Sequence, residues 1–136
     1  MIFLLDTSAF SDLMRAHPAM DSHLAALQPG DRTIICTIVR GEIAYGLALL
    51  PEGKRRAALA AKAAALLAAV PCEAIPPAAG EHYAAMKLAR ERRGLALDEN
   101  DLWIAATALA PWATLVTRDT DFRQVDGLPV ENWTGV

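Results

Sequence analysis

Short apolar runs rich in branched residues alternate with segments of helical character along this sequence. The run IFLL at 2–5 ends in DTS (6–8), a sequence typical of a buried strand that leads directly into a helix. RTIICT at 32–37 and ATLVT at 113–117 have the same strand character. Strands that alternate with helices favour a mostly parallel sheet covered on both faces. The pattern therefore predicts an α/β fold with three layers, α/β/α.

The remaining elements follow from residue propensities and from the positions of proline and glycine. Helices are expected over 19–28, 38–50, 52–69, 78–93 and 99–110. Two shorter strands are expected over 70–77 and 128–133, and RDTDF at 118–122 is expected to be a loop or a short helix. With no repeat or linker, residues 1–136 are expected to form a single domain that buries roughly two-thirds of its unfolded surface.

Composition argues against several classes of protein. The two cysteines form no CxxC pair and the three histidines are scattered, which disfavours structural zinc and favours a reduced, cytoplasmic protein. The apolar start lacks a basic region, and the Ala/Leu-rich stretch 57–70 is short for a membrane span and contains Lys62. Neither export nor a membrane partner is expected. A net charge of −3 argues against a nucleic-acid partner unless several carboxylates are bound to a metal.

Three aspartates, Asp6, Asp119 and Asp121, stand just past the ends of expected strands. At a junction of strand and helix, Asp is often only a cap or a turn residue. In a parallel α/β sheet, the crevice beyond the carboxyl ends of the strands is also where ligands bind. The pattern leaves both roles open for each aspartate.

Glu42 is harder to explain as a surface charge. Its neighbours three and four positions away on the expected helix are Ile38, Val39, Tyr45 and Gly46, with no Lys or Arg to pair with it. An unpaired charge that points inward is costly, so it needs a partner or a shifted pKa. A distant Arg and a metal ion are both candidate partners.

The segment LDENDLWIAATALA at 97–110 places three carboxylates at the start of an apolar helix. Asp98 and Asp101 have the spacing of an N-cap and the N3 position, although Asp at N3 is a weaker reciprocal cap than Glu or Gln. Asp98 can therefore cap the helix while Asp101 points into the crevice.

Together these carboxylates predict a metal-dependent activity. Two carboxylates ~4 Å apart repel by about 4 kcal/mol at an effective dielectric of about 20, so a cleft holding several of them needs protons or cations. Sites made of oxygen ligands suit Mg²⁺ or Mn²⁺, which promote hydrolysis of phosphoryl and phosphodiester bonds. The sequence contains no P-loop, no GxGxxG motif and no Ser-His-Asp set that competes with this interpretation.

With these acidic residues in view, the chain resembles the PIN-domain family, and within it the VapC-type toxin ribonucleases of type II toxin–antitoxin systems. The resemblance covers essentially the whole chain and rests on four segments in order: FLLDTSAF, TIVRGEIAYG, NDLWIAATAL and LVTRDTDFRQVDGLPVENW. It implies a PIN-like (Rossmann-like) fold and an endoribonuclease that depends on Mg²⁺ or Mn²⁺ and cleaves RNA. It also implies a homodimer and a cognate VapB-type antitoxin whose tail covers the active site.

The resemblance also implies a role for each motif residue. The catalytic metal ligands would be Asp6, Glu42, Asp101 and Asp119. The residues that orient these ligands would be Thr7, Ser8, Thr117 and Asp121. The basic residues that could position RNA phosphates, or equally be plain surface charges, are Arg15, Arg40 and Arg118. The TRDTDF loop leaves open whether Asp119 or Asp121 completes the site, and Asp119 is favoured. The preference for RNA over DNA comes from the resemblance alone.

Two other classes of protein share parts of this pattern. Aspartyl-phosphate phosphohydrolases and receiver domains are parallel α/β folds with Asp after the first strand. The former need a second Asp where Ser8 stands, and the latter need an acidic pair and a late Lys that this chain lacks. A non-catalytic module could use the acidic pocket only to bind a basic peptide, which is disfavoured because all four motif carboxylates are present.

Overall fold

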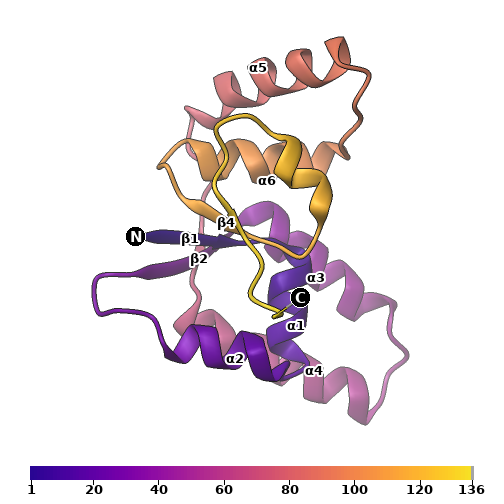
Figure 1. Cartoon of the computed structure of the whole chain (residues 1–136). Helices are drawn as coiled ribbons and strands as arrows, with labels where there is room; N and C mark the ends of the chain where they lie inside the picture. The colour runs from indigo at the N-terminus through magenta and orange to yellow at the C-terminus, as the bar shows by residue number, and fades with distance from the viewer. Residues whose placement is uncertain (136) are drawn as a thin grey trace.

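A parallel five-stranded sheet forms the centre of the computed structural model, which describes residues 1–135 (Figure 1). The strand order is β3-β2-β1-β4-β5, and each pair of neighbours is parallel. The strands are β1 (Ile2–Leu5), β2 (Arg32–Cys36), β3 (Cys72–Glu73), β4 (Thr114–Val116) and β5 (Val130–Glu131). This arrangement confirms the predicted α/β class.

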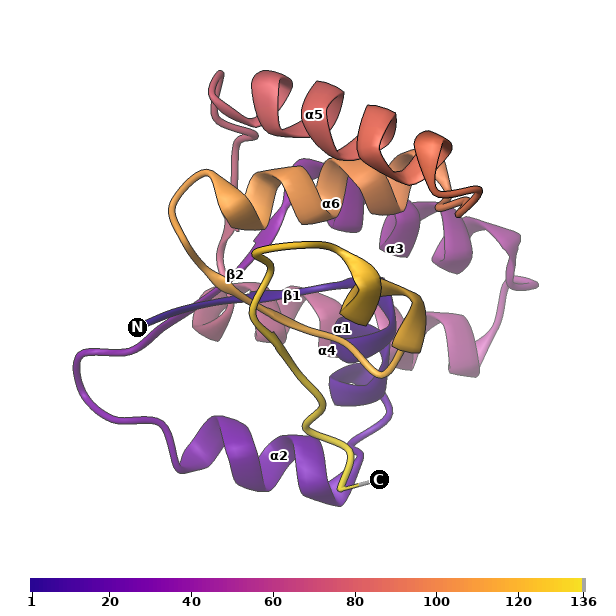
Figure 2. The same cartoon turned by 45° about the horizontal axis from the view of Figure 1, so that its top comes forward.

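Helices cover both sides of this sheet. They are α1 (Thr7–Met14), α2 (Pro18–Ala25), α3 (Thr37–Leu49), α4 (Lys54–Ala69), α5 (Ala79–Arg92) and α6 (Glu99–Leu109), with a 3-10 helix, η1 (Thr120–Gln124). Figures 1 and 2 show α5 and α6 together on one side of the sheet and α1, α2 and α4 on the other, which gives the three expected layers. α3 begins where β2 ends and contacts both α1 and α6. Within residues 1–135, no helix is long and apolar enough to cross a membrane.

The register of the central strands aligns the carboxyl ends of these strands, and the acidic residues follow directly after them. Leu5 of β1 pairs with Val116 of β4, so Asp6 and Thr117 follow side by side. The Asp6 N–H donates to the Val116 carbonyl at 3.1 Å and extends this ladder by one step. β2 pairs with the other edge of β1 and runs directly into α3. Three segments therefore leave the same edge of the sheet, at its carboxyl end.

Apolar burial fixes α6 against this sheet. Leu4 and Leu115 are fully buried in the central strands, and Ile104 and Ala108 of α6 are fully buried in the same core. Full burial of one Leu or Ile side chain contributes about 1.5–3 kcal/mol. The first turn of α6, which carries Asp101, is therefore held in a defined place by the apolar residues that follow it.

The two edge strands are shorter than the sequence suggests. The expected strands over 70–77 and 128–133 reduce to β3 and β5, which have two residues each. Proline accounts for both differences, because it has no N–H to donate to a ladder. Pro71 and Pro129 contribute only their carbonyls, which accept from backbone N–H groups of β2 and β4.

Two helix starts differ from expectation for backbone reasons. α2 begins at Pro18 and ends at Ala25 instead of covering 19–28, since proline suits the first position of a helix. α4 begins at Lys54 because Gly53 before it has a φ of 153°, which lies far from helical values. The other expected helices agree with the structure to within about a residue.

Candidate active site

Acidic side chains from four separate segments line one pocket at the carboxyl edge of the sheet. The pocket has a volume of about 330 Å³. Its lining residues are Asp6, Thr7, Ser8, Glu42, Asp101, Arg118 and Asp119. The structure thus brings together all four carboxylates that the sequence nominates as metal ligands. They come from the end of β1, the middle of α3, the first turn of α6 and the loop after β4.

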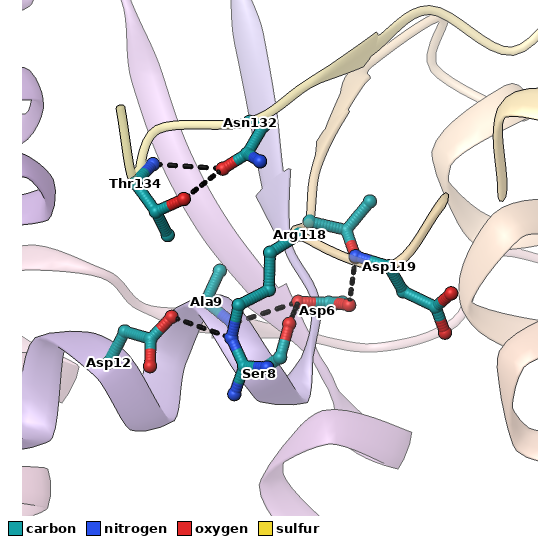
Figure 3. A network of polar contacts seen from close by, with 9 residues as sticks. Asp6, Ser8, Ala9, Asp12, Arg118, Asp119, Asn132 and Thr134 are labelled. Carbon is teal, nitrogen blue, oxygen red and sulfur yellow. Dashed lines mark hydrogen bonds and ion pairs between the residues drawn. The ribbon is translucent and has the colours of Figure 1, made fainter. Parts of the chain in front are cut away.

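Asp6 is buried, with 5% of its surface exposed, and its carboxylate is held on both sides. Its Oδ1 accepts from the Ser8 hydroxyl and the Ala9 N–H, each at 2.8 Å, which makes it the N-cap of α1 (Figure 3). Its Oδ2 accepts from the Thr117 hydroxyl. Burial raises the pKa of Asp6, the three hydrogen bonds oppose that rise, and the charge of Asp119 adds to it. These donors hold the carboxylate in one orientation.

Glu42 finds its partner in a neutral side chain. Its Oε1 accepts a hydrogen bond of 2.7 Å from the Thr7 hydroxyl, and Glu42 is only partly exposed. Among the described residues, no Lys, Arg or His forms an ion pair with it. The distant Arg considered from the sequence is therefore not its partner here. Its charge stays uncompensated beside the other carboxylates.

Asp98 and Asp101 divide the two roles considered for the start of α6. Asp98 is the N-cap, and its carboxylate accepts a hydrogen bond of 3.1 Å from the Asn100 N–H. Asn100 is the second residue of α6, one position before Asp101 at N3. The pKa of Asp101 is raised to about 7, first by burial and then by the charges of Asp98, Glu42, Asp119 and Asp6. The cap therefore also contributes charge to the pocket, which the sequence interpretation did not include.

Asp119 lines the pocket, whereas Asp121 does not. The Asp119 carboxylate accepts from the Asp121 N–H at 2.9 Å and caps η1. The Asp119 N–H donates to the Thr117 hydroxyl at 3.0 Å, so Thr117 links Asp119 to Asp6. The side chain of Asp121 is exposed. Asp121 contacts Asp119 through its backbone N–H. Any orienting effect of Asp121 on Asp119 therefore acts through its backbone N–H, and the role itself stays a prediction.

The three nominated arginines lie in different places. Arg118 lines the acidic pocket, and its Nε donates to Asp12 of α1 at 3.0 Å (Figure 3). Arg15 lines a neighbouring groove between α1, α3 and α4 that shares Thr7 and Glu42 with the pocket. Arg40 is exposed and lines neither cavity. Sequence reasoning missed Asp12, because it stands 106 residues from Arg118 and no local pattern connects them.

The donor set fits a hard divalent cation. All four acidic groups offer carboxylate oxygens, the type of ligand that Mg²⁺ and Mn²⁺ prefer. Burial is the main cause of the raised pKa values of Asp6 and Asp101, and the charges of neighbouring carboxylates add to both. A divalent cation would neutralise those charges. Within residues 1–135, however, no three His, Cys, Asp or Glu side chains are already arranged to hold a metal ion. Small side-chain movements would have to accompany binding.

Comparison with known proteins identifies the family. The model of the PIN domain matches residues 3–128. The chain is a PIN-domain protein. Ribonuclease VapC2 of Rickettsia felis is 29% identical to it over 135 residues, or 98% of each chain. The structure of VapBC2 from the same organism, bound to a promoter DNA fragment, matches with a TM-score of 0.88 at 28% identity, over 98% of this chain and 99% of that one.

A further solved structure, from a toxin–antitoxin system, is similar to this PIN-domain protein. VapBC-5 of Mycobacterium tuberculosis, a member of the VapBC family of toxin–antitoxin systems, matches with a TM-score of 0.73 at 25% identity, over 96% of each chain. The resemblance to the VapC group of PIN domains, first drawn from four short segments, is confirmed over nearly the whole length.

Removing the Asp101 charge should stabilise the metal-free protein. The unfolded carboxyl ionises near its ordinary pKa of 3.8, whereas the folded one ionises near 7, so the free energy of unfolding falls as pH rises between these values. We therefore expect Asp101→Asn to raise the Tm at pH 8. The gain should be on the order of 1 kcal/mol, or about 3–5 °C, because the Asp101 side chain is only partly buried and solvent screens its charge.

Thermal melts in EDTA at pH 5 and pH 8 measure this difference. The gain should be larger at pH 8 than at pH 5. Asp121→Asn is the matched control, since that side chain is exposed outside the pocket, and it should change the Tm little. A lower Tm for Asp101→Asn at pH 8 would instead make Asp101 a structural cap.

Proposed function

We propose that this PIN-domain protein is a VapC-type toxin, a metal-dependent endoribonuclease that a cognate VapB-type antitoxin inhibits. The convergence of Asp6, Glu42, Asp101 and Asp119 in one pocket carries the proposal. Its relatives support it, since the R. felis homologue is named a ribonuclease. RNA is the substrate class, and the cytoplasm is the proposed place of action.

The four carboxylates would hold Mg²⁺ or Mn²⁺, with Asp6 and Asp101 as the main ligands. A divalent cation bound there supplies neutralising charge for the scissile phosphate and activates water for attack on phosphorus. Thr117 and Ser8 fix the Asp6 carboxylate, and Thr7 fixes that of Glu42, so that their oxygens face the pocket. An in-line attack by water would leave a 3′-hydroxyl and a 5′-phosphate.

Arg118 is the proposed contact to the RNA backbone. It is the one cation lining the acidic pocket within the described residues. Asp12 accepts only its Nε–H, which leaves the two terminal nitrogens of the guanidinium available to a phosphate. The Asp12 side chain is 13% exposed and therefore a well-fixed anchor. Arg40 lies outside the pocket and is therefore a weaker candidate for contact with the RNA backbone.

The antitoxin would occupy the groove next to the acidic pocket. This groove has a volume of about 220 Å³, and its walls include Met14, Ile43, Leu47 and Leu59. Because it shares Thr7 and Glu42 with the pocket, a segment bound in it would also block access of RNA to the carboxylates. Such a segment would be apolar with a basic end, to match the groove and the pocket in turn.

A homodimer is proposed through the exposed side of α3. Tyr45 and Leu49 are 68% and 66% exposed and stand four residues apart, so they form one apolar face. Exposed apolar faces of this kind commonly mark protein interfaces. Sedimentation equilibrium tests the assignment: the mass should be that of two chains, and the mass of one chain would contradict it.

RNA cleavage by the purified protein, free of antitoxin, tests the proposed activity. We expect cleavage of structured RNA with Mg²⁺ or Mn²⁺ and none in EDTA, because the carboxylates alone repel a phosphate. Asp101→Asn should lower the rate by about 10²-fold or more, since it removes a ligand of the cation. The Asp121→Asn control should retain activity. DNA of the same sequence tests the preference for RNA.

Gel analysis of end-labelled RNA gives the result directly. Cleavage that persists in EDTA, or an absence of cleavage with every metal, would contradict the proposed function. A folded protein that binds basic peptides but never cuts would favour the non-catalytic module.

Arg118→Gln should weaken RNA binding without unfolding the protein. In the Asp101→Asn background, where RNA is bound but not cut, we expect a loss of about 5–10-fold in affinity. The dependence of log K on log salt should fall by about one unit for the lost phosphate contact. Asp12→Ala should give a smaller loss, because it frees Arg118 without removing it.

Fluorescence anisotropy at several salt concentrations measures both quantities. Arg40→Gln is the matched comparison, an exposed arginine outside the pocket, and should change the affinity less. Equal losses for Arg40→Gln and Arg118→Gln would show general electrostatic attraction and contradict a specific role for Arg118.

A further inference from the structure

Arg90, near the end of α5, is a buried cation with an incomplete set of partners. Only 5% of the residue is exposed. Its Nη2 donates to the Ala96 carbonyl at 3.1 Å, but its Nε and Nη1 are buried without a hydrogen-bond partner. Among residues 1–135, no carboxylate forms an ion pair with it. Two of the three guanidinium nitrogens therefore point to no acceptor.

Such an arrangement is costly unless something else compensates it. Arg keeps its charge under all ordinary conditions, so it cannot escape by losing a proton. A buried and unpaired charge destabilises a protein by several kcal/mol. An apolar residue of similar length would fill this place without that cost. The cation therefore indicates a ligand that supplies the missing acceptors.

A cavity lies against Arg90. It has a volume of about 230 Å³, and its walls include His82, Met86, Arg93, Leu109 and Asp126. α5 provides one wall, while the end of α6 and the segment just after η1 provide the others; Figure 2 shows these three segments on the same side of the sheet. A cavity of this volume is large enough for a small oxyanion together with a few waters.

The charges around this cavity favour an anion. Arg90 and Arg93 both line it, and Asp126 is the one carboxylate among its lining residues. Asp126 is 90% exposed and stands 3.7 Å from Arg93, a weak surface pair that leaves Arg90 uncompensated. In a chain of net charge −3, this cavity is thus a local positive site.

We propose that the cavity between α5, α6 and η1 binds a phosphate-type oxyanion through the guanidinium of Arg90. A guanidinium presents parallel N–H groups that match two oxygens of a phosphate. Because Nε and Nη1 are covered in the present rotamer, binding requires the guanidinium to turn toward the cavity that Arg90 lines.

Two sources of phosphate share this chemistry: inorganic phosphate and the backbone of RNA. α6 and η1 both begin near the acidic pocket, at Asp101 and Asp119, and both end at this cavity. An RNA strand leaving the pocket could therefore follow them. The RNA source rests on the proposed function, whereas binding of inorganic phosphate does not.

Titration of the metal-free protein with inorganic phosphate tests the site directly. In EDTA and at constant ionic strength, the Nε–H signal of Arg90 should shift in NMR spectra and saturate at about 1–10 mM phosphate. The signal is assigned as the one that Arg90→Met lacks. Thermal melts should show a rise in Tm with phosphate for the wild type and at least a tenfold weaker response for Arg90→Met.

Arg90→Met also tests the buried charge itself. Without phosphate, the variant should be at least as stable as the wild type, because Met fills the site without an unpaired cation. Arg90→Lys keeps the charge but loses the parallel N–H groups of the guanidinium. Its rise in Tm with phosphate should therefore lie between those of the wild type and Arg90→Met. Arg92→Met, an exposed arginine on the same helix, is the matched control and should respond as the wild type does.

A second experiment separates the two sources. RNA binding is measured in the Asp101→Asn background with and without Arg90→Met. If the double variant binds RNA more weakly than Asp101→Asn alone, and with a smaller salt dependence, the site contacts the RNA backbone. If the two variants bind RNA equally well, the site binds free phosphate. The proposal is overturned if the Arg90 signal does not move with phosphate, or if Arg90→Met responds as the wild type does. Failure of RNA cleavage leaves the phosphate titration unaffected.

Discussion

The hydrogen bonds that hold the Asp6 carboxylate are the interaction on which the site depends. Asp6 follows β1, Thr117 follows β4, and the pairing of Leu5 with Val116 brings the two together. The Ala9 N–H, a free donor of the first turn of α1, fixes the other oxygen. One side chain thus joins the sheet, the first helix and the loop that carries Asp119. A shift of one residue in the pairing of β1 with β4 would break the Thr117 contact, whereas the Ser8 and Ala9 contacts are local to the start of α1.

The site concentrates negative charge that folding alone would oppose. Hydroxyl groups of Thr7, Ser8 and Thr117 orient the carboxylates without neutralising them. Among residues 1–135, Arg118 is the one cation that lines the pocket, and it is bound to Asp12 outside the acidic cluster. The pKa of Asp101 is raised to about 7, first by burial and then by the charges of the neighbouring carboxylates. The apolar core must offset this repulsion, as is common where a protein trades stability for function.

Much of the fold and of the acidic pocket follows from the sequence, because both depend on local patterns. Parallel strands end at a common edge, which allows Asp6 and Asp119 to meet there, and the resemblance to the PIN-domain family assigns both to one pocket. Glu42 was singled out because its helix offers no cation at suitable spacing. The separation of Asp98 as a cap from Asp101 as a pocket residue also followed from helix-end chemistry.

Contacts between distant segments could not be predicted in the same way. The bonds from Thr7 to Glu42 and from Arg118 to Asp12 span 35 and 106 residues, and no periodicity signals them. Arg90 lies in a helix with basic neighbours, a pattern that by itself is typical of a solvated face, whereas the structure buries it. Tertiary packing decides such cases, and local propensity does not.

The most direct test of the account is the pKa of the Asp101 side chain, measured by the carbon NMR shift of its carboxyl during a pH titration. Burial, and after it the charges of the neighbouring carboxylates, raise the pKa of Asp101 to about 7, so the titration in EDTA should give a value near 7. With saturating Mg²⁺ the pKa should fall by about 2 units or more, because the ligand must lose its proton to bind. An ordinary pKa near 4 in EDTA, or one that Mg²⁺ leaves unchanged, would contradict the account.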